Sequence, residues 1–187
     1  MTPWESFYPD VLPYVPKGTP DPLVTWQLRR AAQSFCRSTR AWRTTLDAVS
    51  TAAGQLEYDI EFPPGAELVR VESASLGDQP LTVWRSIADG QGQFVATRDG
   101  KTAVLSQQVA EGLPLVLTVT LTPSDTASGI ESDIFDRYSE LIANEALARI
   151  TGDGARHERF LSDCATLRVD LWRGTAATQP RTRANWF

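Results

Sequence analysis

The sequence predicts an α+β fold: a helical bundle with an inserted antiparallel β-sheet or sandwich and an extended C-terminal tail. Apolar residues recur at helical spacing in two separate ranges, 21–41 and 130–173. Between them, residues 42–122 form short alternating runs bounded by Gly and Pro turns, a pattern typical of strands. Residues 174–187 have no regular apolar period. The chain of 187 residues is long enough for a single domain with a substantial core.

Residues 1–20 contain five prolines, a density that prevents a continuous helix. Aromatic and branched side chains are interleaved with these prolines: Trp4, Phe7, Tyr8, Tyr14 and Val15. A chain so rich in aromatic residues is a poor candidate for a freely solvated arm. We therefore expect an extended N-terminal segment that lies on the body of the protein.

The first helix is expected to begin at Asp21, an N-cap residue, with Pro22 at the first helical position. Its apolar stripe has spacings of 4, 3 and 4, which define one helix face: Val24, Leu28, Ala31 and Phe35. The helix is expected to end at about Ser38 or Thr39.

Alternating runs predict strands over 56–60, 68–76, 81–84, 93–97, 102–107 and 113–122. Asp99 and Gly100 lie between two of these runs and indicate a hairpin turn. The clearest strand, 113–122, has one wholly apolar face and one face made largely of threonine. This alternation predicts an antiparallel sheet with one solvent-exposed side.

Two further helices are expected over 130–150 and 156–172, joined by a short turn at 151–154. The apolar stripe of the last helix repeats the spacings of the first one: Phe160, Cys164, Leu167 and Leu171. The short turn predicts that these two helices pack as an antiparallel hairpin.

The net charge of −5 conceals a separation of charge along the chain. Residues 22–46 carry +5 and residues 173–187 carry +3, which leaves −13 for the remainder. Such a division suits a subunit whose basic face meets an acidic surface, and the overall acidity disfavours a simple nucleic-acid binder. The first basic segment contains Arg29, Arg30, Arg37, Arg40 and Arg43. We expect these arginines to make structural or subunit contacts, and binding of phosphates beside Trp26 and Trp42 is the alternative.

Catalytic and metal-binding patterns are missing from the sequence. His157 is the only histidine and is expected to be an exposed residue near a helix start. Residues 152–154 lack the following Lys-Ser/Thr of a phosphate loop, and 125–133 lack the ligand spacing of a calcium loop. Glu140 and Glu145 are expected on a solvated helix face, without a catalytic partner. We therefore expect no enzyme, cofactor or metal site.

Two cysteines, Cys36 and Cys164, are too few for a disulfide framework. Each falls on an apolar helical position, so buried free thiols are favoured over a Cys36–Cys164 bridge or a reactive thiol. No run approaches the ~18 apolar residues that cross a bilayer. The N-terminal residues also lack the basic and then apolar pattern of a signal peptide.

The tail ends in Trp186 and Phe187, close to Arg181 and Arg183. An extended tail has no core of its own in which to bury two aromatic side chains. Docking on a partner is therefore favoured, while packing back on the same chain and plain disorder remain alternatives. This feature points to an assembly component.

The chain resembles the head-to-tail adaptor proteins of tailed bacteriophages, connector proteins of the tail-tubular or gatekeeper type. The resemblance is carried by residues 8–47, by GQLEYDI at 54–60, by LVRVESASLGDQPL at 68–81 and by the final ANWF. It covers most of the chain in layout and is most specific in residues 8–81.

The resemblance implies a virion protein, assembled in the bacterial host cytoplasm, that forms a ring, commonly of twelve copies, beneath the portal protein. Genomic DNA would pass through the ring without sequence-specific binding, and tail tube or nozzle proteins would attach to it. The portal contact would fall on Arg181, Arg183, Asn185, Trp186 and Phe187. Whether the basic first helix faces DNA, portal or a neighbouring copy stays open. A tail-completion or terminator protein is the alternative, and a nucleic-acid-binding module a weaker one.

Overall fold

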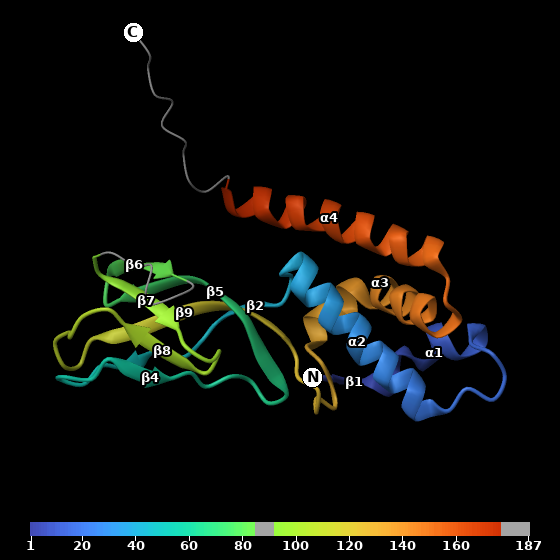
Figure 1. The fold of residues 1–187 in the computed structure, drawn as a ribbon, viewed down its shortest axis with the longest axis horizontal. Coiled ribbons are helices and arrows are strands. Elements are labelled where there is room, and N and C mark those ends of the chain that lie inside the picture. Colours follow the sequence, from blue (N-terminus) through green and yellow to red (C-terminus); the bar gives the residue numbers. More distant parts are fainter. Residues whose placement is uncertain (85–91, 177–187) are drawn as a thin grey trace, which may run out of the picture.

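The computed structural model describes residues 1–84 and 92–176, and its helices and strands separate into two ends of an elongated molecule (Figure 1). Helices α1, α2 and α3 lie at one end and the strands of the main sheet at the other. Helix α4 runs across the other helices, and its C-terminal part reaches above the boundary between helices and sheet. The predicted α+β class, with a β region inserted between helices from both ends of the chain, is confirmed.

The N-terminal segment is a series of short helical turns, so the expectation of an extended segment was wrong. After β1 (Thr2–Pro3) come η1 (Trp4–Phe7), α1 (Tyr8–Val11) and η2 (Leu12–Tyr14). Prolines occupy the first turns of α1 and η2, where a missing N–H breaks no helical hydrogen bond. Proline density therefore shortens the helices here without abolishing them.

The same segment is anchored to the helices by its aromatic side chains, as its composition suggested. Trp4 and Phe7 are fully buried. The indole Nε1 of Trp4 donates a hydrogen bond of 2.8 Å to the carbonyl oxygen of Ala127. The Phe7 ring packs edge-on against Phe135, with 4.8 Å between the ring centroids.

Helix α2 (Asp21–Thr39) has the predicted end, but its N-cap is Pro20 instead of Asp21, which already belongs to the helix. Its four stripe residues are completely buried: Val24, Leu28, Ala31 and Phe35. The C-cap of the helix is Arg40, which adopts a left-handed conformation with φ of 58°. A left-handed residue is a common helix C-cap, although glycine usually fills that role.

The β region forms one eight-stranded sheet in the order β2-β9-β5-β6-β7-β8-β4, with β3 also paired to β9. The strands are β2 (Arg43–Thr45), β3 (Val49–Ser50), β4 (Glu57–Asp59), β5 (Ala66–Leu76), β6 (Gln79–Trp84), β7 (Phe94–Thr97), β8 (Thr102–Leu105) and β9 (Pro114–Pro123). The predicted hairpin at Asp99 and Gly100 joins β7 to β8. The expectation of a purely antiparallel sheet was wrong, because β6 and β7 pair in parallel.

The solvent-exposed side expected for the last strand is only partly present. Along β9, Thr118 is half-buried, whereas Thr120 and Thr122 are buried. Gln33 of α2 donates a hydrogen bond to the carbonyl oxygen of Pro123, so this end of β9 lies against α2. The hydroxyl of Thr120 is satisfied by a 2.8 Å hydrogen bond to a carboxylate oxygen of Glu72.

Helices α3 (Ser132–Thr151) and α4 (Gly154–Ala176) form the predicted hairpin around a turn whose Gly152 has φ of 71°. Helix α4 extends past residue 174, where the tail was expected to begin. The small pair β1 and β10 (Gly129–Ile130) joins the N-terminal segment to the chain just before α3. A Cβ on Gly129 would clash with the carbonyl oxygen of Thr2, so this pairing requires glycine.

Candidate interaction surface

Of the five arginines in the basic segment, Arg29 has an internal structural role. Its guanidinium donates hydrogen bonds of 2.7 Å to the carbonyl oxygen of Asp125 and 3.0 Å to that of Ala127. One turn along α2, Gln33 Nε2 donates to the carbonyl oxygen of Pro123 and to the carboxylate of Asp125. Together, these side chains fix the loop between β9 and β10 to α2.

Arg40 also contacts its own chain. Its guanidinium lies 3.7 Å from a carboxylate oxygen of Glu72, and Arg70 lies 3.4 Å from the other oxygen of that carboxylate. Glu72 is nearly buried, so these arginines neutralise a carboxylate held between α2 and the sheet. Arg40 therefore joins the helical end of the protein to the strands.

Arg43 lies on β2 and faces a different part of the surface. It is exposed and lines a small cavity of about 170 Å³ between α2, β2 and α4. Arg40, Arg168 and Glu72 line the same cavity. Arg29 thus contacts the loop between β9 and β10, and Arg40 and Arg43 line this cavity. The remaining two arginines of the basic segment lie on the outer side of α2.

Four residues form the outer side of α2, which we call the α2 face: Leu23, Trp26, Arg30 and Arg37. At 100° per residue these positions lie within one sector of the helix, opposite the buried stripe. Trp26 is 49% exposed, and the guanidinium carbon of Arg30 lies 5.9 Å from the centroid of its ring. A cation at this distance from an indole is attracted by the ring. The α2 face thus joins apolar surface to positive charge.

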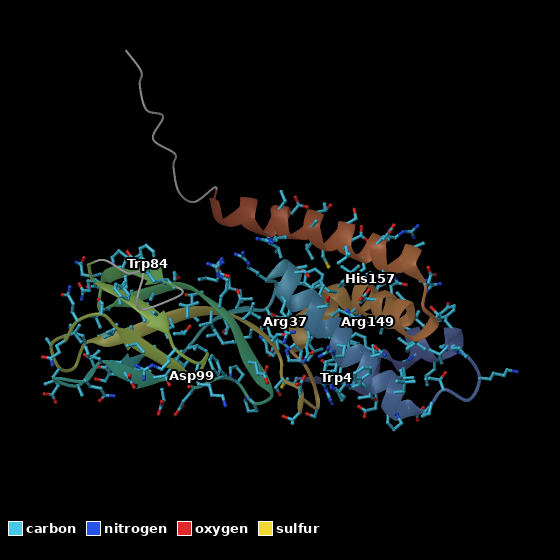
Figure 2. All side chains as sticks on the ribbon, in the orientation of Figure 1. Trp4, Arg37, Trp84, Asp99, Arg149 and His157 are labelled. Carbon is cyan, nitrogen blue, oxygen red and sulfur yellow. The ribbon has the colours of Figure 1, made fainter. Side chains whose placement is uncertain are left out.

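A buried polar cluster between α3 and α4 contradicts two expectations from the sequence. Glu145, expected on a solvated face, has no exposed surface. Its carboxylate oxygens lie 2.6 Å from Arg149 Nε and 2.9 Å from His157 Nδ1. Figure 2 labels Arg149 on α3 and His157 on α4. His157 was expected to be exposed, but it is half-buried and hydrogen-bonded to Glu145 across the helix hairpin. The two residues are twelve positions apart and lie on different helices, so no helical spacing in the sequence indicates their contact.

Cys36 and Cys164 are buried free thiols, as predicted. Burial raises the pKa of Cys36 to about 12, and burial together with the nearby Glu145 carboxylate raises that of Cys164 to about 12. Because the thiolate is the nucleophilic form, neither cysteine is an activated nucleophile. The polar cluster next to Cys164 joins α3 to α4 through the contact between Glu145 and His157.

Within residues 1–84 and 92–176, no group of three or more His, Cys, Asp or Glu side chains is arranged to hold a metal ion. No helix of that part of the chain is long and apolar enough to cross a membrane. The predicted portal-binding residues lie outside the described residues: Arg181, Arg183, Asn185, Trp186 and Phe187. No protein-family model matches the chain, and a search of curated proteins finds no match either.

Proposed function

We propose that this protein is a structural head-to-tail adaptor of a tailed bacteriophage. It assembles as a homo-oligomeric ring, of twelve copies by the resemblance, beneath the portal protein of the virion. The ring extends the channel for genomic DNA and offers tail tube or nozzle proteins a surface for attachment. The binding energy of the ring is summed over many copies, so the contact that each single copy makes with the portal can be weak.

One observation carries the proposal: the α2 face leaves a large aromatic side chain exposed next to the exposed, positively charged Arg30 and Arg37. Tryptophan and arginine are enriched at the centres of protein interfaces. Arg30 lies over the Trp26 ring, and Arg37 is exposed on the same side of the helix. A subunit built for assembly provides a reason to keep such a face in solvent.

The sequence of the tail supports the same function. Trp186 and Phe187 follow two arginines in a segment with no apolar period. We propose that this segment binds the portal protein, with the aromatic rings filling apolar pockets and the arginines pairing with acidic residues.

The decisive experiment removes residues 180–187 and measures attachment of the purified protein to DNA-filled heads. We expect a folded protein that no longer attaches, because the proposed portal contact has been deleted. A matched control, Gln179→Ala, changes one tail residue outside the deleted segment and should attach normally. Normal attachment of the truncated protein contradicts the proposal.

Arg29 and Arg40 weaken the nucleic-acid alternative, because their guanidinium groups contact the protein's own carbonyl and carboxylate oxygens. A nucleic-acid module would have to rely on Arg30, Arg37 and Arg43. Binding of duplex DNA by the monomer, weakening steeply as salt increases, would favour that alternative.

A further inference from the structure

Helix α3 has an exposed stripe whose charge is opposite to that of the α2 face. Asp133, Asp136 and Glu140 recur at spacings of 3 and 4 and are all exposed. Arg137 is the one cation within this stripe, so the stripe has a net charge of −2. Spacings of 3 and 4 place side chains on the same side of a helix.

A cleft of about 570 Å³ opens beside this stripe, between α3 and the N-terminal turns. It is lined by the carboxylates of Asp10 and Glu140 and by Tyr14, whose side chain is among the most exposed aromatics of the described residues. Arg156 also lines the cleft, but its guanidinium lies 3.2 Å from the Asp153 carboxylate. The cleft therefore offers two carboxylates and an aromatic ring to an incoming group.

The α2 face cannot reach this cleft within one molecule. Helices α2 and α3 pack against each other through their buried sides, where the Phe35 and Tyr138 rings lie 5.0 Å apart. The exposed stripe of each helix lies on the side turned away from that contact. Two complementary surfaces of one chain thus lie on different sides of the same helical layer.

We propose that the α2 face of one copy docks in the acidic cleft and on the α3 stripe of the next copy. The indole of Trp26 and the guanidinium of Arg30 enter the cleft, where Asp10 and Glu140 neutralise the charge and Tyr14 covers the ring. Arg37 pairs with the remaining carboxylates of the α3 stripe. The inference rests on the proposed function in taking the partner to be a second copy of this chain.

A second copy fits this surface better than a nucleic acid does. Leu23 and Trp26 are 41% and 49% exposed, and such apolar side chains need an apolar or aromatic partner to leave water. Phosphates would satisfy the arginines alone. The acidic cleft supplies both the carboxylates and the aromatic ring.

Because the contact joins two different surfaces, each copy keeps one of them available for a further copy. Contacts of this head-to-tail kind generate closed rings when the rotation between neighbours closes, and open filaments when it does not. A symmetric two-fold dimer, in contrast, would use the same patch on both subunits. The proposed contact therefore supplies the geometry that a ring requires.

Cross-linking between two separately purified full-length chains tests the contact even if it is weak. One chain carries Trp26→Cys and the other Glu140→Cys, and the two are mixed under a mild oxidant. The native thiols are buried with raised pKa values, so they do not compete. With equal amounts of the two chains, we expect the mixed disulfide to exceed twice either symmetric one, the ratio that random pairing gives. The proposal is overturned if the mixed disulfide is no more abundant than random pairing predicts. It is also overturned if a control chain with Asp78→Cys cross-links to the Trp26→Cys chain as well as the Glu140→Cys chain does.

Charge reversal provides the second measurement. The variants R30E/R37E and D136R/E140R should each lose at least about tenfold in self-association, the equivalent of about 1.4 kcal/mol. An equimolar mixture of the two variants should recover self-association, because the acidic α2 face of one variant then meets the basic α3 stripe of the other. The control R98E/K101E makes the same charge change as R30E/R37E, but on the β7–β8 hairpin, and should have no effect on self-association.

The outcomes separate this inference from the proposed function. If self-association or head attachment is normal in R30E/R37E, the α2 contact is wrong while the adaptor function stands. If the mixed disulfide forms but the truncated protein still attaches to heads, the contact stands and the function falls. Salt-sensitive duplex DNA binding that R30E/R37E abolishes, without a mixed disulfide, overturns the contact in favour of nucleic acid.

Discussion

Helices α2 and α4 carry apolar stripes with identical spacing but bury them to very different extents. The four stripe residues of α2 are all completely buried. Along α4, exposure rises from 1% at Phe160 and Cys164 to 37% at Leu171, the last member of the stripe. The same 4-3-4 pattern thus describes one helix fixed along its whole length and one fixed mainly through its first half.

The difference shows that apolar periodicity predicts a helix and its apolar side. The burial of that side depends on which other elements of the fold pack against it. Helix α2 packs against α3, α4, η1 and β9. Helix α4 packs against α2 and α3, and its C-terminal part reaches past them toward the sheet (Figure 1). The two helices should therefore respond differently to the loss of equivalent side chains.

The largest effect is expected for Phe35→Ala in α2. This change removes a fully buried ring that packs on Tyr138, and it should cost about 3–5 kcal/mol of unfolding free energy. Chemical denaturation monitored by circular dichroism measures the loss. Because α2 contacts both helices and sheet, the whole molecule should unfold in one transition at lower denaturant. A separate transition for the helical end would contradict this view.

A smaller and more local effect is expected for Phe160→Ala in α4. Its ring is buried, but α4 packs on the body from one side only, so the loss should be about 3 kcal/mol, the low end for this substitution. Hydrogen exchange should show faster exchange of α4 amides, with the sheet unchanged. Equal acceleration of exchange throughout the protein would show that α4 is as firmly integrated as α2.

Thiol labelling compares the two helices without altering a core side chain. Both thiols are buried with pKa values raised to about 12, so labelling at neutral pH requires an opening event. Local release of α4 carries Cys164 into solvent, whereas Cys36, its neighbour across the contact between the helices, stays on α2, which remains packed against α3, η1 and β9. We expect Cys164 to react at least about tenfold faster, a difference of about 1.4 kcal/mol in opening free energy. Cys36→Ala and Cys164→Ala, each leaving one thiol, are the matched variants, and equal rates would contradict the comparison.

The raised pKa of the Cys36 thiol also predicts how the stability of the protein changes with pH. In the unfolded chain the Cys36 thiol loses its proton near its ordinary pKa of 9.0, while in the folded protein it keeps the proton to about 12. Between these values the folded state binds more protons than the unfolded state, so stability should fall as pH rises above 9.0. Cys36→Ala should reduce this slope.

Sequence reasoning succeeded where a local pattern controls the structure. The end of α2, the hairpin at Asp99 and Gly100 and the short turn before α4 all follow from nearby residues. It failed where contacts between segments distant in the sequence determine the structure. The parallel pairing of β6 with β7 and the burial of Thr120 and Thr122 depend on tertiary neighbours that no local alternation encodes.

The candidate surface shows the same limit. Composition identified the arginines of the basic segment, but only the fold separates Arg29 and Arg40, which contact their own chain, from Arg30 and Arg37 on the outer side of α2. Likewise, the contact between Glu145 and His157 forms across a helix hairpin. Neither residue carries a sequence signal for the other.

The smallest effect is expected at the end of the α4 stripe. Leu171 is 37% exposed although it occupies the position equivalent to Phe35, so Leu171→Ala should change the unfolding free energy by no more than about 0.5 kcal/mol. Val169→Ala, on another side of the same helix, is the control and should behave alike. Denaturation midpoints of the two variants provide the measurement. A loss near that of Phe160→Ala would mean that the C-terminal half of α4 is held as tightly as its beginning, and the contrast between the two helices would then disappear.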